Sequence, residues 1–300
     1  MTVLALAIGP AELVAAQVAE DVDDEDIRRV PVTDRTSWET CRDLLYEVAQ
    51  GANVASVGIG SVGPVDMAAG VVAPSGIAQW RAGFGIVDAA RKAFPGAEVN
   101  LAVDGVCVAQ AERAFGATRG VMDAVSLSVS GHIAGGVMMG GFVAVGRTGN
   151  AGHIGHLLVP GFDERCACGG HGCLEAVASG SAMLGWARAH GWGGTTLTEL
   201  IAAADLGEEA AAAAAGRAGV ALGRAIASVA ALLDIDLVVL GGAVAECGPA
   251  LWKPLGEAVA EHARLSYLPG LRVVPSPLGE LGVLAGAGVL AMAGSSAGSQ

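Results

Sequence analysis

Lysine is nearly absent from this chain of 300 residues and occurs only as Lys92 and Lys253. Lysine and arginine together number 17 against 30 aspartates and glutamates, which gives a formal net charge of -13. Such a chain attracts a phosphate backbone poorly, because non-specific binding to nucleic acid depends on basic side chains. We therefore expect no nucleic-acid partner. We also expect no helix-turn-helix ahead of the first strand-like segment, which begins at Val3.

Signals for export and membrane insertion are missing as well. The first residues lack the basic segment with which a signal peptide begins. The long apolar stretch at 210–233 is interrupted by Arg217 and Arg224, which a membrane-spanning helix tolerates poorly. Six cysteines without an export signal favour a metal or redox role over a disulfide framework. The sequence thus predicts a cytoplasmic protein with no membrane partner.

The composition excludes a disordered chain. Hydrophobic residues make up 53% of the sequence, charged residues only 16%, and the mean hydropathy is +0.54. Disordered chains lack the apolar surface needed to offset the entropy of ordering. Because a single hydrophobic core stops growing near ~250 to 300 residues, a chain of this length fits two domains.

Strand-like and helix-like segments alternate along the chain, which is typical of the α/β class. The sequence predicts strands at 3–8, 54–59, 100–104, 124–129, 136–145, 237–242 and 272–275, and helices at 38–50, 85–94, 208–233 and 252–263. We expect a smaller N-terminal domain at 1–115, joined by a C-terminal helix at 282–293, and a larger domain at 116–281. The tail after Ala293 is expected to be disordered.

One histidine and three cysteines have the spacing of a metal site. His156, Cys166, Cys168 and Cys173 form the pattern H-x9-C-x-C-x4-C, with glycines between the cysteines that allow short turns. Four nitrogen and sulfur ligands complete a tetrahedron around Zn²⁺ and leave no position open, which predicts a structural zinc. The alternative is that the three cysteines are simply buried, which is also our expectation for Cys41, Cys107 and Cys247, scattered in apolar surroundings.

The run GHIGHLLVPGFDERCACGGHGCLEAVASG at 152–180 resembles the signature of the ROK family, which includes repressors and sugar kinases. Three further runs resemble other landmarks of the family in the same order: GPVDMAAGVVAPSG at 63–76, VDGVCVAQAERAFGATRG at 103–120 and LVVLGGAVAE at 237–246. The resemblance implies an actin-like, ribonuclease H-like fold of two domains, with a sugar and ATP in the cleft between them.

The resemblance also implies roles for individual residues. Asp104 matches the general base that accepts the proton of the attacking sugar hydroxyl. Ser75, His153, His156 and Glu175 match positions that contact the sugar, and His156 also matches a metal ligand. From the residues alone, Asp104 fits a site at the end of a strand or a local cap equally well. Glu175 could equally be an acid that stabilises the first turn of a helix.

The segments that handle phosphate in the family are altered here. Where the family has D-x-G-G-T-K, residues 7–12 read AIGPAE; Ala7 cannot interact with Mg²⁺, Pro10 has no N–H, and Glu12 adds negative charge near phosphate. The second phosphate loop reads SGHIAGG at 130–136, and histidine replaces a glycine in it. The positions that match cofactor-binding residues are Gly131, His132 and Gly135, together with Gly241 and Gly242 on the adenosine side.

Sugar contacts of the family are altered too. Val103 and Val106 replace two asparagines, and His153 replaces the glutamate of G-E-x-G-H. Each lost polar contact leaves a buried group unpaired at a cost of ~1 to 3 kcal/mol, which argues against ordinary glucose recognition. His132 and His153 could each bind an anion, act as acid or base, or only fill space.

Three functions remain open at this level. We favour a zinc-stabilised non-kinase, a pseudokinase, that binds a small sugar-derived ligand. The alternative is an active ATP-dependent hexose or amino-sugar kinase with Asp104 as general base, and ATP and Mg²⁺ are expected only in that case. The third is an enzyme of another reaction class built on Asp104, His132 and His153. The resemblance suggests a homodimer.

Overall fold

The computed structural model describes residues 2–18 and 26–297, and the side chains of 294–297 are not described. The chain forms two compact units. Unit 1 comprises Met1–Ala114, Val143–Gly152 and Leu281–Gln300, and unit 2 comprises Phe115–Phe142 and His153–Glu280. The segment Val143–Gly152 therefore belongs to unit 1, whereas the boundary expected from the sequence assigned it to the second domain.

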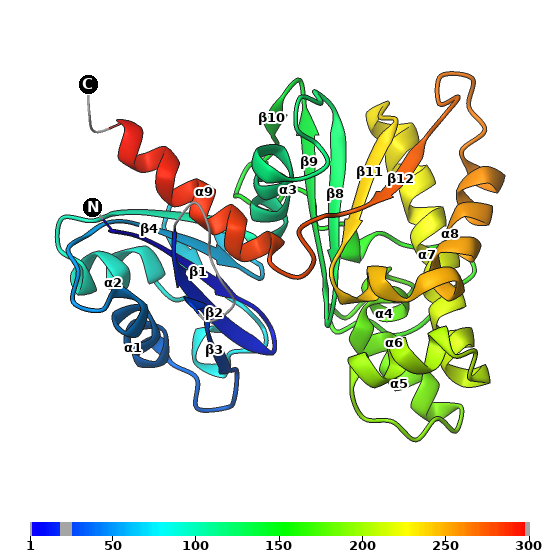
Figure 1. Ribbon diagram of the computed structural model, residues 1–300, viewed down its shortest axis with the longest axis horizontal. Helices are drawn as coiled ribbons and strands as arrows, with labels where there is room; N and C mark the ends of the chain where they lie inside the picture. Colours follow the sequence, from blue (N-terminus) through cyan, green and yellow to red (C-terminus); the bar gives the residue numbers. More distant parts are fainter. Residues whose placement is uncertain (1, 19–25, 298–300) are drawn as a thin grey trace. The chain divides into compact units, whose positions relative to one another are not determined.

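Unit 1 is built on a five-stranded sheet in the order β3-β2-β1-β4-β7 (Figure 1). Its strands are β1 (Thr2–Ile8), β2 (Glu12–Gln17), β3 (Arg28–Pro31), β4 (Val54–Ser61) and β7 (Glu98–Val103). The first three pair antiparallel, whereas β1, β4 and β7 pair parallel. The parallel strands are nearly continuous apolar runs because both of their faces are covered.

Four α-helices accompany this sheet within the described residues: α1 (Trp38–Ala49), α2 (Ile86–Ala93), α3 (Asp104–Phe115) and α9 (Gly282–Ala297). A small antiparallel pair, β5 (Val65–Asp66) and β6 (Val71–Val72), and the 3-10 turn η2 (Ala78–Trp80) complete the unit. Glycine allows α9 to pack closely, since a Cβ on Gly58 of β4 would overlap the backbone of Ala287 and one on Gly286 would overlap that of Cys107. These contacts explain why the C-terminal helix joins the N-terminal unit.

Unit 2 is built on a second five-stranded sheet in the order β10-β9-β8-β11-β12. The chain passes into unit 1 at Val143, the last residue of β10. Its elements are β8 (Ala124–Val129), β9 (Ile133–Met139), β10 (Phe142–Val143), η3 (Ile154–His156), α4 (Glu175–Ala178), α5 (Gly180–Ala189), α6 (Leu197–Asp205), α7 (Glu209–Leu233), β11 (Leu237–Gly241), η4 (Ala243–Glu246), α8 (Gly248–His262) and β12 (Arg272–Pro275). Strand β11 pairs parallel with β8 and β12, and β8 pairs antiparallel with β9.

The long alanine-rich helix α7 is the core helix of unit 2. Among the described residues it alone is long and apolar enough to match a membrane span, and 56% of its most apolar window is buried inside the protein. It packs against α8 through Gly219 and Gly223, where a Cβ would meet the backbone of Leu251 and Leu255. This packing accounts for the apolar composition of the helix.

Three of the differences between the sequence-based boundaries and the structure have a clear physical reason. The strand expected at 136–145 is two strands, because Gly140 and Gly141 have φ of 58° and 78° and form a turn between β9 and β10. Helix α8 begins at Gly248, ahead of the expected start at Trp252, because Pro249 fits its first turn. Helix α9 continues to Ala297, where disorder was expected; residues 298–300 lie outside the described part.

Candidate functional site

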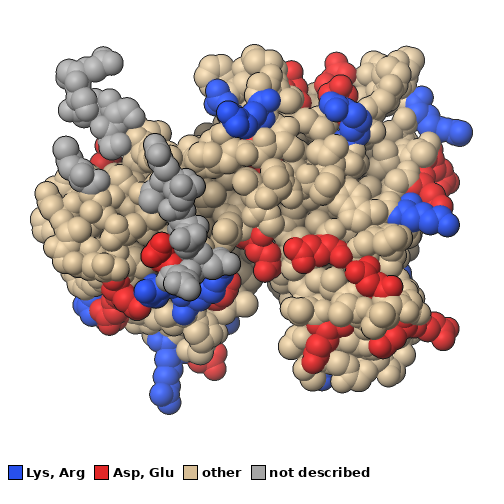
Figure 2. Space-filling view, in the orientation of Figure 1, with Lys and Arg blue, Asp and Glu red and all other residues tan. Residues whose placement is uncertain are grey.

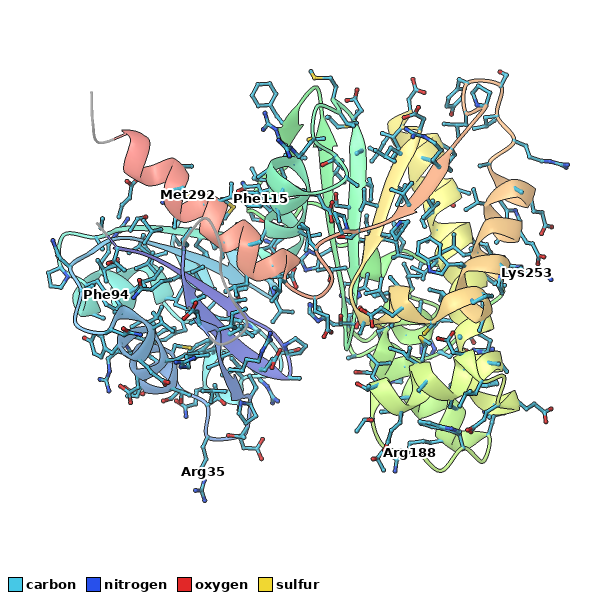
Figure 3. The ribbon with its side chains drawn as sticks, in the orientation of Figure 1. Arg35, Phe94, Phe115, Arg188, Lys253 and Met292 are labelled. Carbon is cyan, nitrogen blue, oxygen red and sulfur yellow. The ribbon has the colours of Figure 1, made fainter. Side chains whose placement is uncertain are left out.

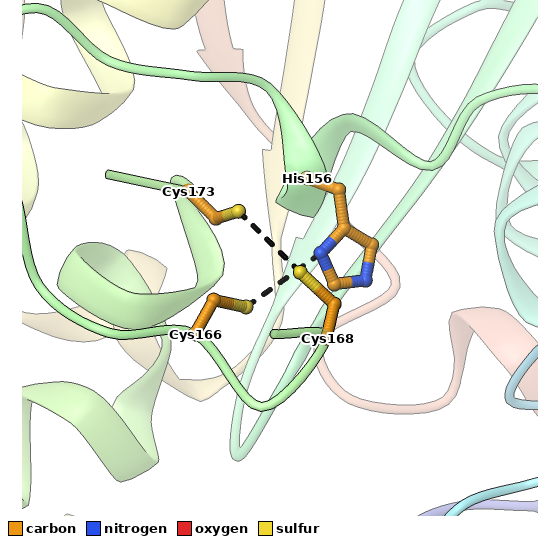
Figure 4. Close-up of side chains that lie close together, drawn as sticks. All are labelled: His156, Cys166, Cys168 and Cys173. Carbon is orange, nitrogen blue, oxygen red and sulfur yellow. Dashed lines mark hydrogen bonds between the residues drawn. The ribbon is translucent and has the colours of Figure 1, made fainter. Parts of the chain in front are cut away.

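The four metal-ligand candidates converge in unit 2 (Figure 4). One donor atom from each of His156, Cys166, Cys168 and Cys173 lies within 4.8 Å of all the others. Cys166 Sγ is 3.7 Å from His156 Nδ1, and Cys168 Sγ is 3.7 Å from Cys173 Sγ. With Zn–S bonds of about 2.3 Å, the edge of a tetrahedron is about 3.8 Å, so these distances fit four-coordinate zinc. They are too long for a disulfide.

The loop between the ligands is shaped by its backbone. Cys166 N–H donates to the carbonyl of Gly170, and Gly169 N–H donates back to the carbonyl of Cys166. Gly169 and Gly172 have φ of 95° and 71°, in the left-handed region that favours glycine. The resulting tight turns bring Cys168 and Cys173 together, as the glycine spacing predicts.

The protonation of these ligands also suits a metal. Partial burial and the neighbouring His153 lower the pKa of His156, which favours the neutral imidazole that can donate a lone pair. A hydrogen bond from the backbone of Gly170 lowers the pKa of the exposed Cys168 thiol. Burial raises the pKa of the Cys173 thiol to about 12, and a bound dication would offset that effect by stabilising the thiolate. The donor set therefore fits zinc.

The other three cysteines are not part of this cluster. Cys41 and Cys107 are fully buried in the core of unit 1, and Cys247 is fully buried in unit 2. Burial raises the pKa of Cys41 and Cys247 to about 12, and that of Cys107 further still. Such thiols are apolar packing groups at neutral pH.

Glu175 and His153 lie beside the cluster. Glu175 begins α4, and its Oε2 accepts a hydrogen bond of 2.9 Å from the N–H of Ile133 in β9. The same oxygen lies against Gly155, where a Cβ would be only 2.9 Å away. The rings of His153 and His156 are stacked with centroids 6.0 Å apart. Three sequence-predicted residues, His153, His156 and Glu175, thus come together around η3.

The segment expected to handle phosphate in unit 2 is the turn between β8 and β9. Ser130 Oγ accepts from the N–H of Ala243 at 3.0 Å and donates to Glu280 Oε1 at 3.2 Å. The carbonyl of Ser130 accepts from Gly180 N–H at 2.6 Å. Gly131 and His132 lie in this turn, whereas Gly135 lies within β9 and pairs with Leu127. No sequence motif surrounds Glu280, so the sequence alone does not point to it.

Gly241 is the last residue of β11 and Gly242 follows it, and the structure explains both glycines. Gly242 has φ of 81°, and a Cβ there would lie 2.6 Å from the backbone N and O of Val129. A Cβ on Gly241 would lie 2.7 Å from the Cβ of Ser276. These glycines are therefore required for the close approach of β11 to its neighbours, whatever else they bind.

Asp104 lies in unit 1, at the junction between β7 and α3. It is 6% exposed, and its Oδ1 accepts a hydrogen bond of 2.7 Å from the N–H of Gly105. The strand predicted at 100–104 ends at Val103, so Asp104 is the first residue of the helix. Asp104 can serve both as a local cap and as a site residue. Its carboxyl group binds the neighbouring backbone and also lies at the end of a parallel strand, where α/β proteins bind ligands. Val103 and Val106 are fully buried in the core.

The remaining predicted residues of unit 1 are more exposed. Ser75 is exposed, and its carbonyl accepts from Arg81 Nε at 2.9 Å. Glu12 follows the turn of the β1–β2 hairpin, where Gly9 N–H donates to the carbonyl of Glu12. Its carboxylate forms an ion pair with Arg29 of β3, at 3.3 Å. Arg29 therefore partly offsets the negative charge that Glu12 adds to this hairpin.

On the visible face of the protein, acidic and basic side chains lie in mixed groups (Figure 2). Two α/β units, each with a five-stranded sheet, carry a buried strand-end acid in one and a thiol-imidazole cluster in the other. This combination defines the class: a two-domain α/β protein with a candidate metal centre.

Comparison with known proteins identifies the family. The ROK family profile matches residues 3–293, and the chain belongs to the ROK family. It is 32% identical over 264 residues to a glucokinase of Thermotoga maritima, covering 83% of each chain. It is 33% identical over 254 residues to an N-acetylmannosamine kinase of Shigella flexneri, covering 81% of this chain and 84% of that protein.

A solved structure shows the same fold. The ROK glucokinase of Streptomyces griseus, in complex with glucose and AMPPNP, superimposes with a TM-score of 0.84 and 24% identity, covering 98% of this chain and 100% of that one. The protein is thus sugar-kinase-like, with the actin-like two-domain α/β fold of its family.

Proposed function

We propose that this protein is an ATP-dependent sugar kinase that phosphorylates a hydroxyl of a hexose or an N-acetylated amino sugar. The relatives named glucokinase and N-acetylmannosamine kinase favour this alternative over the non-kinase that the altered phosphate segments suggested. The observation that carries the proposal is Asp104, a buried carboxyl held at the carboxyl end of a parallel strand.

In the proposed reaction, Asp104 accepts the proton of the sugar hydroxyl as its oxygen attacks the γ-phosphorus of ATP. The bond between that phosphorus and the bridging oxygen breaks, and ADP leaves with the electron pair. Holding the hydroxyl and the base together in a preset geometry supplies much of the rate enhancement. Mg²⁺, bound with ATP, would neutralise charge on the phosphates.

Around the sugar, we assign binding roles to Ser75, His153, His156 and Glu175. His153 and Glu175 flank η3, whose last residue is the metal-ligand candidate His156. We propose that a structural Zn²⁺ held by His156, Cys166, Cys168 and Cys173 fixes η3 and α4, so that these polar side chains are ready to bind. The turn at Gly131 and His132, with Gly135, Gly241 and Gly242, is the proposed nucleotide side.

The direct test is a kinase assay that measures ADP release with glucose and with N-acetylmannosamine. The purified protein should turn over at least one of them. Asp104→Asn should lower kcat by a factor of 100 or more, because a general base contributes 10²–10⁴-fold. Asp88→Asn, an exposed acid on α2 of the same unit, should leave the rate unchanged. Equal rates for wild type and Asp104→Asn would overturn the assignment.

The second candidate is the non-kinase that binds a sugar-derived ligand. The observation that favours it is the β1–β2 hairpin, where Ala7, Pro10 and Ala11 replace the polar groups of the family's phosphate segment. Calorimetry of Mg²⁺-ATP decides between the two. Micromolar binding supports the kinase, and no heat at millimolar nucleotide supports the non-kinase.

We further propose that the protein is a cytoplasmic homodimer. The family resemblance supports the dimer, and the ordinary role of a sugar kinase in metabolism supports the location. Light scattering coupled to gel filtration should return twice the chain mass of 29.6 kDa. A mass equal to one chain would refute the dimer.

A further inference from the structure

A cavity between α7 and α8 lies outside the proposed kinase site. Its volume is about 500 Å³, within the range of small-molecule sites. Small side chains create the space, because Gly161, Ala227 and Ala231 leave the wall unfilled. Arg224, Ser228 and His262 supply its polar groups.

Arg224 is the main charge of this cavity. It occupies the same face of α7 as Arg217, seven residues earlier, and both guanidinium groups lie over the ring of Phe162 at 5.3 Å and 5.8 Å. Arg217 is paired with the carboxylate of Glu164. Among the described residues, Arg224 has no carboxylate partner; its Nη1 donates to the carbonyl of Pro160 at 2.6 Å.

The hydrogen bonding of Arg224 is incomplete. Its Nε is buried and has no hydrogen-bond partner within the part of the chain that the structure describes. A half-buried cation without a counterion is costly, because burial removes water that nothing replaces. The remaining atoms of the guanidinium form a planar fork that matches carboxylate and phosphate oxygens.

His262, at the end of α8, gives the cavity a second nitrogen donor. Its side chain is 40% exposed, and its Nε2 lies 3.9 Å from Glu261, beyond ordinary hydrogen-bonding distance. Ser228 already donates its hydroxyl to the carbonyl of Arg224, so Ser228 forms the wall without adding a free donor. Arg224 and His262 therefore present donors on opposite helices, and both favour an anion.

We propose that this cavity binds a small organic anion through its oxygen atoms, a carboxylate or a phosphate, with Arg224 as the principal contact. The volume exceeds that of a bare phosphate and leaves space for a carbon skeleton against Ala227 and Ala231. This inference goes beyond the proposed kinase reaction and does not depend on it, since no nucleotide or sugar hydroxyl is involved.

Titration calorimetry without nucleotide tests the proposal, with inorganic phosphate, glucose 6-phosphate and citrate as separate probes. We expect at least one probe to bind the wild-type protein with millimolar affinity or better. Arg224→Gln should weaken that binding at least tenfold, and His262→Gln should weaken it severalfold. Binding of citrate alone would identify a carboxylate site, and binding of the phosphates alone a phosphate site.

Lys253→Gln is the matched control. Lys253 is an exposed cation on α8 (Figure 3). It is not among the residues that line the cavity, and its loss should change the affinity less than twofold. Asp104→Asn distinguishes binding of glucose 6-phosphate at the kinase site from binding in the cavity, because this substitution in unit 1 should leave the cavity of unit 2 intact.

If Arg224→Gln proves unstable, Ala231→Leu is the second variant, since it fills the cavity and keeps the charge of Arg224. Absence of heat with all probes, or unchanged binding by both cavity variants, overturns the proposal.

Discussion

Arg29 Nη1 on β3 lies 3.3 Å from Glu12 Oε1, so the acid in the altered phosphate hairpin has a basic neighbour from the next strand. Both side chains are nearly half exposed, at 43% and 47%, and such a pair contributes little to stability. In the proposed kinase, the pair would act electrostatically, by reducing the repulsion that Glu12 exerts on a polyphosphate.

The Glu12–Arg29 pair predicts opposite effects on nucleotide binding. Two unit charges about 4 Å apart in water interact by about 1 kcal/mol, which is about fivefold in affinity. Glu12→Gln should therefore tighten Mg²⁺-ATP binding by up to about fivefold, and Arg29→Gln should weaken it by a similar factor. Calorimetry at low salt measures both. Arg42→Gln, whose partner is Asp43 on α1, serves as control; equal affinities in all variants would contradict the prediction.

The cysteine cluster predicts one zinc ion per chain that supports unit 2. Chelation should lower the melting temperature by about 5 to 10 °C, because 1 kcal/mol corresponds to roughly 2–4 °C in domains of this size and a structural zinc contributes several kcal/mol. Metal analysis and calorimetric melting are the measurements. Cys173→Ser should lose the metal, whereas Cys41→Ser should retain it. A full complement of zinc in Cys173→Ser would show that the ligand set is wrong.

Helix α6 begins with a capping box that predicts a pH-dependent contribution to stability. Glu199 accepts hydrogen bonds from the backbone N–H groups of Thr195 and Thr196, and these bonds lower its pKa. A lowered folded-state pKa stabilises the protein above the ordinary pKa of glutamate, and the contribution is lost as pH falls through the folded value. Glu199→Gln should lower the melting temperature slightly at pH 7, and this difference should disappear in acid. Melting curves across pH test it, with the exposed Glu209 of α7, substituted Glu209→Gln, as a control.

Gly242 predicts a steric effect at the end of β11. An alanine Cβ there would press into the backbone of Val129 and would also require φ of 81°. Gly242→Ala should lower the free energy of unfolding by about 1 to 3 kcal/mol, as strained backbone positions typically do. Gly185→Ala in α5 meets no atom within 4 Å and should be neutral or stabilising by about 0.5 to 1 kcal/mol. Urea unfolding compares the two, and equal losses would refute the steric argument.

Local patterns predicted several elements well. The strands at Ala124–Val129 and Arg272–Pro275 have the expected bounds, because short runs of β-branched residues between turn residues need little tertiary information. The start of α8 was missed, because Gly248 and Pro249 resemble a turn until the helix behind them is known. The spacing of the histidine and cysteines was enough to predict the metal-ligand candidates. Local backbone hydrogen bonds close the loop from Cys166 to Cys173, so the cysteines come together without help from distant segments.

The sequence by itself determined the alternation of strands and helices, the ROK signature and the thiol-imidazole cluster, because each depends on neighbours within a few turns of chain. Tertiary structure alone decided which polar and charged side chains meet partners that are distant in sequence. Glu12 meets Arg29 across 17 residues, Arg224 meets Pro160 across 64, and Ser130 meets Glu280 across 150. Such pairs form where sheets and helices bring distant segments together, and no local periodicity records them.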